Sequence, residues 1–187
     1  MIIRRTNLED VKQILEVYKS SSHIYPESLT QYEDELNLDY IKNEINNAIN
    51  RGIILVAENQ DKKIIGSFKA YTSKYRKLAH IMTNATFVTM PTQEGKKAFV
   101  LLLKAFLNEL KNNYKHIYKL EGVPHESNKR LVSYYLKNSF IIEGEIKDKI
   151  NNFSKKQFEN EIIISWLNPN FDKKYLEKYC KTLKDII

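Results

Sequence analysis

The sequence predicts a mixed α+β domain, in which one central sheet carries helices on its faces. Strand-type and helix-type hydrophobic patterns follow one another in the order β-α-α-β-β-β-α-β-α-β-β. No repeat, low-complexity segment or Gly/Ser/Pro-rich linker interrupts this order. A length of 187 residues, with 42% hydrophobic and 28% charged residues, is ordinary for one globular domain. We therefore expect a single domain over residues 1–168, followed by a helical tail over 169–187.

The N-terminal part predicts a strand and two helices. Ile2–Arg5 is expected to be a short strand, and Thr6–Glu9 fits an S/T-x-x-E capping box that starts a helix reaching about residue 20. Residues 20–39 are polar with interspersed aromatic side chains, which indicates a loop with short helical pieces. Apolar residues at helical spacing over Tyr40–Arg51 predict the second helix.

Three strands are expected next. Ile53–Glu58 is a continuous run rich in β-branched residues, and Asn59–Lys62 has the residues of a turn. Lys63–Tyr71 is therefore the returning strand of a hairpin. Leu78–Met90 is a third, longer strand, which Pro91 ends.

The second half predicts two helices and three strands, followed by a tail helix. A short polar loop containing Gly95 leads into an amphipathic helix, whose apolar positions run from Ala98 to Leu110 and which extends to about Asn112. The two closing strands are expected to be antiparallel. The remaining expected elements are a strand over His116–Val123, a helix over Asn128–Asn138, closing strands over Phe140–Ile146 and Phe158–Trp166, and a tail helix within Phe171–Ile187.

Composition excludes several classes of protein. No stretch approaches the roughly 20 apolar residues that span a membrane, and the N-terminus has no apolar signal segment, so a cytoplasmic location is expected. The single cysteine, Cys180, cannot form an intramolecular disulfide. One cysteine and four histidines do not match the usual zinc patterns, so no metal is expected.

The formal net charge of +7 favours an anionic partner. Lysines are spread along the whole chain rather than clustered into a stripe, which is more typical of a solvated surface than of a nucleic-acid interface. Nucleic acid is therefore not the expected main partner. An RNA-directed protein stays an alternative, and its binding would weaken steeply with salt.

The segment from Phe87 to Leu103 indicates an anion site. A strand there runs through a short loop into an amphipathic helix. The first N–H groups of a helix have no intrahelical partner, and the helix dipole adds positive potential, so pyrophosphate is a typical ligand. Lys96 and Lys97 add charge at the same place. The segment by itself also fits a plain connection.

The register of this segment resembles the cofactor loop of the GNAT superfamily, P-x-x-Q/R-G-x-G-x-G/A-x-x-L-L. Pro91, Gly95, Leu102 and Leu103 match it without a gap.

Three positions depart from that pattern. Glu94 stands where the family has Gln or Arg, and Lys97 and Phe99 stand where it has small residues. A small residue lets backbone approach phosphate closely, so Phe99 counts against a tight loop. Lys97 compensates if its ammonium group contacts phosphate.

A second segment resembles the other signature of the family, N-x-x-A-x-x-x-Y-x-K-x-G-F. Asn128, Tyr135, Lys137 and Phe140 fit its spacing, while Leu131 and Ser139 replace the two small residues. The following residues 140–148 are similar to the F-x-x-E-G-x-x-x-D ending of the ribosomal-protein N-terminal acetyltransferase branch.

The resemblance implies the GNAT fold, with a central, mostly antiparallel sheet flanked by helices. It implies an acetyl-CoA-dependent N-acetyltransferase that moves an acetyl group to a primary amine of a small molecule, a peptide N-terminus or a lysine, by direct attack in a ternary complex. Tyr135 would protonate the leaving thiolate. The resemblance places the pantetheine arm on the strand backbone at 88–90 and the pyrophosphate at 94–99. The implied cofactor-binding residues are Val88, Thr89, Met90, Glu94, Gly95, Lys96, Lys97, Ala98, Phe99, Asn128 and Tyr135.

The general base is not evident, because the strand before the loop has no carboxylate. His80 is a candidate by its ordinary pKa, although it stands some ten residues before the loop. Asn84 would orient a water, and Glu58 and Glu121 are further candidates on strands. Water or bulk solvent as the proton acceptor is also open.

Another alternative is a GNAT-shaped binding or regulatory module without catalysis. The departures at Glu94, Lys97 and Phe99 and the carboxylate-free strand motivate it. It predicts no acetyl transfer and a partner on the aromatic surface near Tyr25 and Tyr32. A homodimer is left open by analogy with similar folds.

Overall fold

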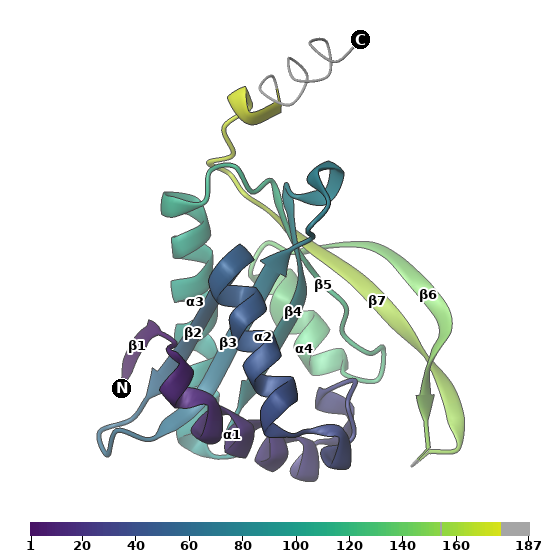
Figure 1. Ribbon diagram of the computed structural model, residues 1–187. Coiled ribbons are helices and arrows are strands. Elements are labelled where there is room, and N and C mark those ends of the chain that lie inside the picture. The colour runs from purple at the N-terminus through teal and green to yellow at the C-terminus, as the bar shows by residue number, and fades with distance from the viewer. Residues whose placement is uncertain (154, 177–187) are drawn as a thin grey trace.

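The computed structural model describes residues 1–153 and 155–176, which form one sheet with helices on both faces (Figure 1). The α-helices of these residues are α1 (Val11–Ile24), α2 (Leu38–Arg51), α3 (Gln93–Asn113) and α4 (Lys129–Lys137). The strands are β1 (Ile2–Arg5), β2 (Gly52–Glu58), β3 (Ile64–Thr72), β4 (Ile81–Thr89), β5 (Lys119–Gly122), β6 (Ile141–Asn152) and β7 (Gln157–Leu167).

The strands lie in the order β1-β2-β3-β4-β5-β7-β6. Every neighbouring pair is antiparallel except β4 and β5, which are parallel. The predicted mixed fold and the predicted order of elements are thus confirmed. β6 and β7 form a long curved hairpin that extends beyond the helical layers (Figure 1).

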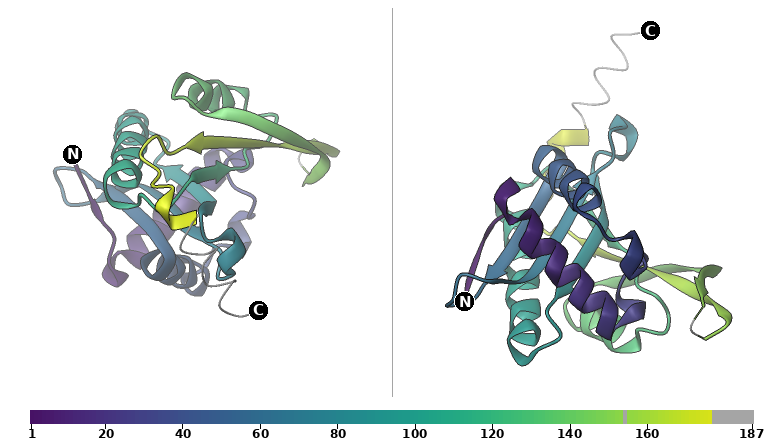
Figure 2. Two further views of the ribbon diagram at one scale, coloured as in Figure 1. Left: turned by 90° about the horizontal axis from the view of Figure 1, so that it is seen from above. Right: turned by 60° about the horizontal axis from the view of Figure 1, so that its bottom comes forward.

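Helices α1 and α2 cover one face of the sheet, and α3 covers the other (Figure 2). Val17, Ile41 and Val56 belong to the core under α1 and α2, whereas Phe68 and Phe106 belong to the core under α3. Because β2 and β3 are covered on both faces, almost every residue in them is buried. This explains their continuous apolar runs, since a strand buried on both faces does not alternate.

The strands β4 and β5 pair over only two positions. Ile81 lies opposite Lys119 and Met82 opposite Leu120. Beyond Met82, β4 pairs only with β3 among the described residues, while β5 continues beside β7. The two central strands therefore separate, and one edge of β4 is left without a neighbouring strand.

The boundaries of some elements differ from the predicted ones. The third strand begins at Ile81 rather than Leu78, because residues Arg76–Leu78 form a 3-10 turn. β5 is shorter than predicted, and β6 continues to Asn152 rather than ending at Ile146. Long pairing with β7 stabilises this exposed extension, which apolar periodicity alone does not reveal.

The prediction of a loop up to about residue 98 was wrong. α3 begins at Gln93, because the Thr92 hydroxyl caps it by accepting a hydrogen bond from the Gly95 N–H at 3.1 Å. The capping box at the start of the chain was also misplaced by one residue. It forms between Asn7 and Asp10 rather than between Thr6 and Glu9.

The chain after β7 is anchored by Asn168. Its side-chain amide donates to the carbonyl oxygens of Leu110 at 3.2 Å and Ile117 at 3.0 Å. The predicted tail helix and Cys180 fall mostly or wholly within residues 177–187, outside the described residues, and the boundary at residue 168 stays a prediction. Among the described residues no helix is long and apolar enough to cross a membrane.

Asp10 joins β1 to the start of α1. Arg4 donates to both of its carboxylate oxygens, at 2.8 Å from Nη1 and 2.9 Å from Nη2, and the Asn7 N–H donates at 2.9 Å. Burial by itself would raise the pKa of Asp10, but the hydrogen bonds from Arg4 and Asn7 outweigh it and lower that pKa below its usual value.

We expect this lowered pKa to make folding stability sensitive to acid. The contribution of Asp10 is complete above its unfolded-state pKa of about 3.9 and is lost as the pH falls through the lower folded-state pKa. Asp10→Asn should therefore have a lower melting temperature than the wild type at neutral pH. When the pH falls below the unfolded-state pKa of Asp10, the melting temperature of the variant should decrease less than that of the wild type. Thermal denaturation by circular dichroism measures both effects. If acid lowered the melting temperatures of the two proteins equally, the lowered pKa of Asp10 would be contradicted.

Candidate active site

The N-terminus of α3 lies directly after β4 and offers donors for an anion. Helix geometry leaves the N–H groups of Gln93 and Glu94 without an intrahelical acceptor, and the helix dipole points its positive end there. The side chains of Lys96 and Lys97 are exposed on the first turns of the helix. Glu94 is exposed on the same turn and places one negative charge beside them.

Because residues 94–99 are helical, their backbone is used differently from a glycine-rich loop. The N–H groups of Lys97, Ala98 and Phe99 lie where they donate within the helix. Gly95 and Ala98 are buried against the sheet. At Gly95 an added Cβ would come within 1.8 Å of the Met90 carbonyl oxygen, so this glycine permits the close contact between α3 and the end of β4.

Phe99 joins α3 to both β4 and α4 through aromatic contacts. Its ring stacks on Phe87 with centroids 4.0 Å apart and meets the edge of Tyr134 at 5.0 Å. Phe87 in turn stacks on Phe68 at 4.5 Å. Phe99, at a position where the GNAT pattern has a small residue, therefore packs its ring between β4 and α4.

Helix α4 carries the second predicted motif. The side-chain oxygen of Asn128 caps it by accepting from the Leu131 N–H at 3.2 Å. Tyr135 is 8% exposed, lies 4.9 Å from the ring of Phe140, and is 6.5 Å from the ring of Phe99. Burial raises the pKa of Tyr135 well above its usual value, and the neighbouring Tyr134 adds to this. The two predicted motifs thus meet through Phe99 and Tyr135.

Within the described part of the chain, the end of β4 pairs with a strand on one side only, where β3 lies. Val88 lies opposite Ser67, Thr89 lies opposite Gly66, and the Met90 N–H donates to the Ile65 carbonyl at 2.8 Å. The residues predicted to hold the pantetheine arm therefore lie on the strand edge that β5 does not cover.

His80 precedes β4 and is not part of it. Its carbonyl oxygen accepts from the Tyr118 N–H at 2.8 Å, next to the two pairs that join β4 to β5. The nine residues of β4 and then residues 90–92 separate it from the start of α3, and the strand by itself spans about 30 Å at the usual rise per residue. The role of His80 as a base stays a prediction, and its place at the opposite end of β4 does not favour it.

The other candidates for a base are spread across the sheet. Glu58 pairs with Arg4 at 2.8 Å near the β1 edge, and Glu121 pairs with Lys119 at 3.1 Å. Asn84 lies on β4 itself, with its side-chain amide donating to Thr83 Oγ1 at 3.0 Å.

One polar cluster was not singled out from the sequence. Lys69 is buried in β3 and forms an ion pair with Glu44 of α2, which also accepts a hydrogen bond from the Tyr71 hydroxyl at 3.1 Å. The available signal was a lysine inside the otherwise apolar strand at residues 64–72. In the described residues no group of three or more His, Cys, Asp or Glu side chains could hold a metal ion.

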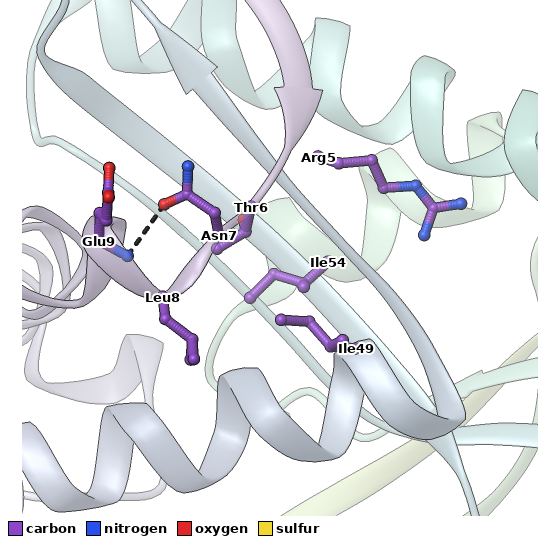
Figure 3. A pocket seen from close by; sticks show the side chains of 7 residues that line it. All are labelled: Arg5, Thr6, Asn7, Leu8, Glu9, Ile49 and Ile54. Atoms are coloured by element: carbon purple, nitrogen blue, oxygen red, sulfur yellow. Dashed lines mark hydrogen bonds between the residues drawn. The ribbon is translucent and has the colours of Figure 1, made fainter.

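Two surface pockets lie outside the predicted site. An open groove of about 520 Å³ lies where β1 leads into α1, and the residues that line it include Arg5, Leu8 and, from α2, Ile49 (Figure 3). A smaller pocket lies between the segment before α2 and the β6–β7 hairpin, where Tyr32 and His125 line it. Neither pocket includes a residue predicted to hold the cofactor.

No protein-family model and no curated protein sequence matches the chain. Solved structures do match its fold, each over 89% of this chain. A ribosomal-protein-alanine N-acetyltransferase from Brucella melitensis matches over 99% of its length, with a TM-score of 0.75 and 14% identity. A GNAT-family acetyltransferase from Streptococcus pneumoniae matches over 98%, with a TM-score of 0.72 and 18% identity. A GNAT phosphinothricin acetyltransferase from Sinorhizobium meliloti, in complex with acetyl-CoA, matches over 88%, with a TM-score of 0.70 and 15% identity.

These neighbours share the arrangement predicted from the two motifs, a mostly antiparallel sheet flanked by helices. The chain therefore has the fold of the GNAT N-acetyltransferases.

Proposed function

We propose that the protein is an acetyl-CoA-dependent N-acetyltransferase acting on a primary amine, which is a small molecule, a peptide N-terminus or a lysine. The observation that carries the proposal is the position of α3, whose N-terminus stands at the end of the open edge of β4 and beside α4. Acetyl-CoA bound in the fold neighbour from Sinorhizobium meliloti supports the choice of cofactor. When bound, acetyl-CoA supplies a thioester acetyl group that an amine can attack.

The residues at the N-terminus of α3 fit the pyrophosphate of this cofactor. Gln93 and Glu94 offer N–H groups without an intrahelical acceptor, and Lys96 and Lys97 offer exposed ammonium groups. The absence of a side chain at Gly95 lets this helix end approach β4 closely. We infer that Lys97 compensates for the charge of Glu94.

The strand and α4 would hold the rest of the cofactor. The open edge of Val88–Met90 offers backbone groups to the amides of a pantetheine arm. The Asn128 amide carries two N–H donors besides the oxygen that caps α4. Tyr135 would give its proton to the leaving thiolate, and its raised pKa keeps that proton in place at neutral pH.

The proton of the attacking amine goes to water in this proposal. Of the residues considered as a base, Glu58 and Glu121 each form an ion pair with a basic residue. His80 lies at the end of β4 that is distant from α3. The amine attacks the thioester directly, in a ternary complex that holds both substrates, so no acyl-enzyme intermediate forms.

Calorimetric titration with acetyl-CoA tests the proposal. We expect micromolar binding to the wild type and about tenfold weaker binding to Lys97→Ala, because a charged hydrogen bond to phosphate is lost. Lys104→Ala, on an exposed position farther along the same helix, is the matched control and should bind as the wild type does. Asn128→Ser retains a helix cap and removes the amide donors, so its affinity should also fall. No binding to the wild type, or equal affinities for Lys97→Ala and Lys104→Ala, would overturn the proposed pyrophosphate site.

One observation favours a second candidate, a binding or regulatory module of the same fold without catalysis. The Phe99 ring packs between Phe87 of β4 and Tyr134 of α4, and Phe87 directly precedes the strand residues 88–90 that are proposed to hold the pantetheine arm. If this ring closes the site, the wild type neither binds acetyl-CoA nor transfers acetyl groups.

Phe99→Ala distinguishes the two candidates. Loss of its aromatic contacts should lower folding stability by about 2 kcal/mol. In the enzyme the same change should alter acetyl-CoA affinity only modestly, whereas in the closed module it should create binding that the wild type lacks. Calorimetry on both proteins, at a temperature where both are folded, gives the answer.

A further inference from the structure

Lys69 is a buried charge that the proposed chemistry does not use. It lies in the middle of β3, between the helical layers, and is 2% exposed. An ammonium group without partners is very unfavourable in such a place, so its contacts indicate what it does.

Its ammonium group contacts three groups. It pairs with the Glu44 carboxylate of α2 and lies 5.2 Å from the ring centre of Tyr71. It also donates a hydrogen bond to the backbone carbonyl oxygen of Asn84 in β4, at 3.1 Å. Burial lowers the pKa of Lys69, while the Glu44 carboxylate opposes that shift.

Asn84 lies at an irregularity of β4. Lys69 is opposite Thr86 and Tyr71 is opposite Thr83, so β4 has one more residue than β3 over this stretch. Asn84 itself has a φ of 51°, in the left-handed region. A bulge of this kind interrupts the ladder of backbone hydrogen bonds, and Lys69 supplies a donor to the Asn84 carbonyl oxygen there.

The bulge lies where β4 leaves β5. The last pair between the two strands is at Met82, and the open edge proposed for the cofactor lies at 88–90. Bulges bend the strand that contains them. The direction of the open edge therefore depends on the backbone conformation at Asn84. Lys69 of β3 stabilises that conformation through its hydrogen bond, and Glu44 of α2 contributes indirectly through its ion pair with Lys69.

We propose that Lys69 is a positioning residue, which fixes the bulge of β4 through the Asn84 carbonyl and so orients the strand edge for acetyl-CoA. Its effect on the cofactor rests on the function proposed above. Its effect on the bulge does not, because it follows from contacts within the protein alone.

Two variants separate positioning from simple stability. Lys69→Met keeps a long side chain, removes the donor to Asn84 and leaves the Glu44 carboxylate without its cation. The double variant Lys69→Met/Glu44→Gln also removes that carboxylate charge, so it should recover thermal stability. Val17→Ala, in the fully buried core of α1 on the same face of the sheet, is a matched destabilising control.

The full chain of each variant is examined by thermal denaturation, by calorimetry with acetyl-CoA, and by amide hydrogen exchange of β4. Both Lys69 variants should bind acetyl-CoA at least about tenfold more weakly and exchange faster at residues 84–89, because the supporting contact is lost. Val17→Ala should melt at a lower temperature with unchanged affinity.

Recovery of affinity together with stability in the double variant would show a purely structural role and overturn the proposal, as would wild-type affinity in Lys69→Met. Unchanged exchange at residues 84–89 would overturn the role of Lys69 at the bulge. A wild type that does not bind acetyl-CoA would overturn the proposed function and the cofactor part of this inference, while the exchange result still decides the part concerning the bulge.

Discussion

Gly95→Ala is expected to destabilise the protein by about 3 kcal/mol, at the upper end for an overpacked site. The new Cβ would lie 1.8 Å from the Met90 carbonyl oxygen and 2.9 Å from its carbonyl carbon. Both are backbone atoms, so no side-chain rotation relieves the contact, and α3 must move away from β4. Urea denaturation measures the loss. Acetyl-CoA affinity should fall as well, because the donors of the helix N-terminus move with it.

Gly144→Ala is the matched control for this change. Its added Cβ would have its nearest neighbour, Ile163, at 4.0 Å, and no glycine of the chain has a positive φ. The control should therefore stay within about 0.5 kcal/mol of the wild type. Equal stability of the two variants would mean that α3 does not approach β4 as closely as described.

Tyr135→Phe is expected to lower kcat for acetyl transfer about 100-fold, since it removes the proposed general acid. The aromatic ring and its contact with Phe140 stay, so the KM for acetyl-CoA should change little. Tyr134→Phe is the matched control on the preceding residue and should leave kcat unchanged. A steady-state assay that detects the released thiol, with a panel of amines, gives both constants.

The raised pKa of Tyr135 adds a pH test of the same role. A general acid acts in its protonated form, and activity is lost only as the pH rises through its pKa. Burial places that pKa well above 10, so the wild-type kcat should not fall between neutral pH and about pH 9. A kcat that declines within this range, or equal kcat values for Tyr135→Phe and the wild type, would contradict the assignment.

Much of the fold could be predicted because local sequence patterns determine most of its helices and strands. The β-branched run at 53–58 and the helical spacing of Ala98, Leu102 and Leu110 depend only on neighbouring residues, and both were located correctly. Boundaries were less predictable, because caps and pairings set them. Thr92 starts α3 at Gln93, and pairing with β7 extends β6 to Asn152.

The candidate site was predictable in part. The motifs around Gly95 and Tyr135 were visible as spacings, and the fold brings them together through Phe99. The close approach of Gly95 to the Met90 backbone was not visible, since it depends on how α3 packs against β4. Likewise, the sequence shows Lys69 only as a lysine in an otherwise apolar strand. Its contacts with Glu44 and the Asn84 carbonyl oxygen are visible only in the tertiary structure.

The sequence by itself thus determined the order of elements, the fold class and the two motifs, because periodicity and spacing act over a few residues. Only the tertiary structure decided that β4 separates from β5 after Met82, that Phe99 packs against Tyr134, and that Lys69 reaches the bulge at Asn84. Each of these contacts joins segments far apart in the chain. Their geometry follows from how the sheet and its two helical layers pack, which no local pattern specifies.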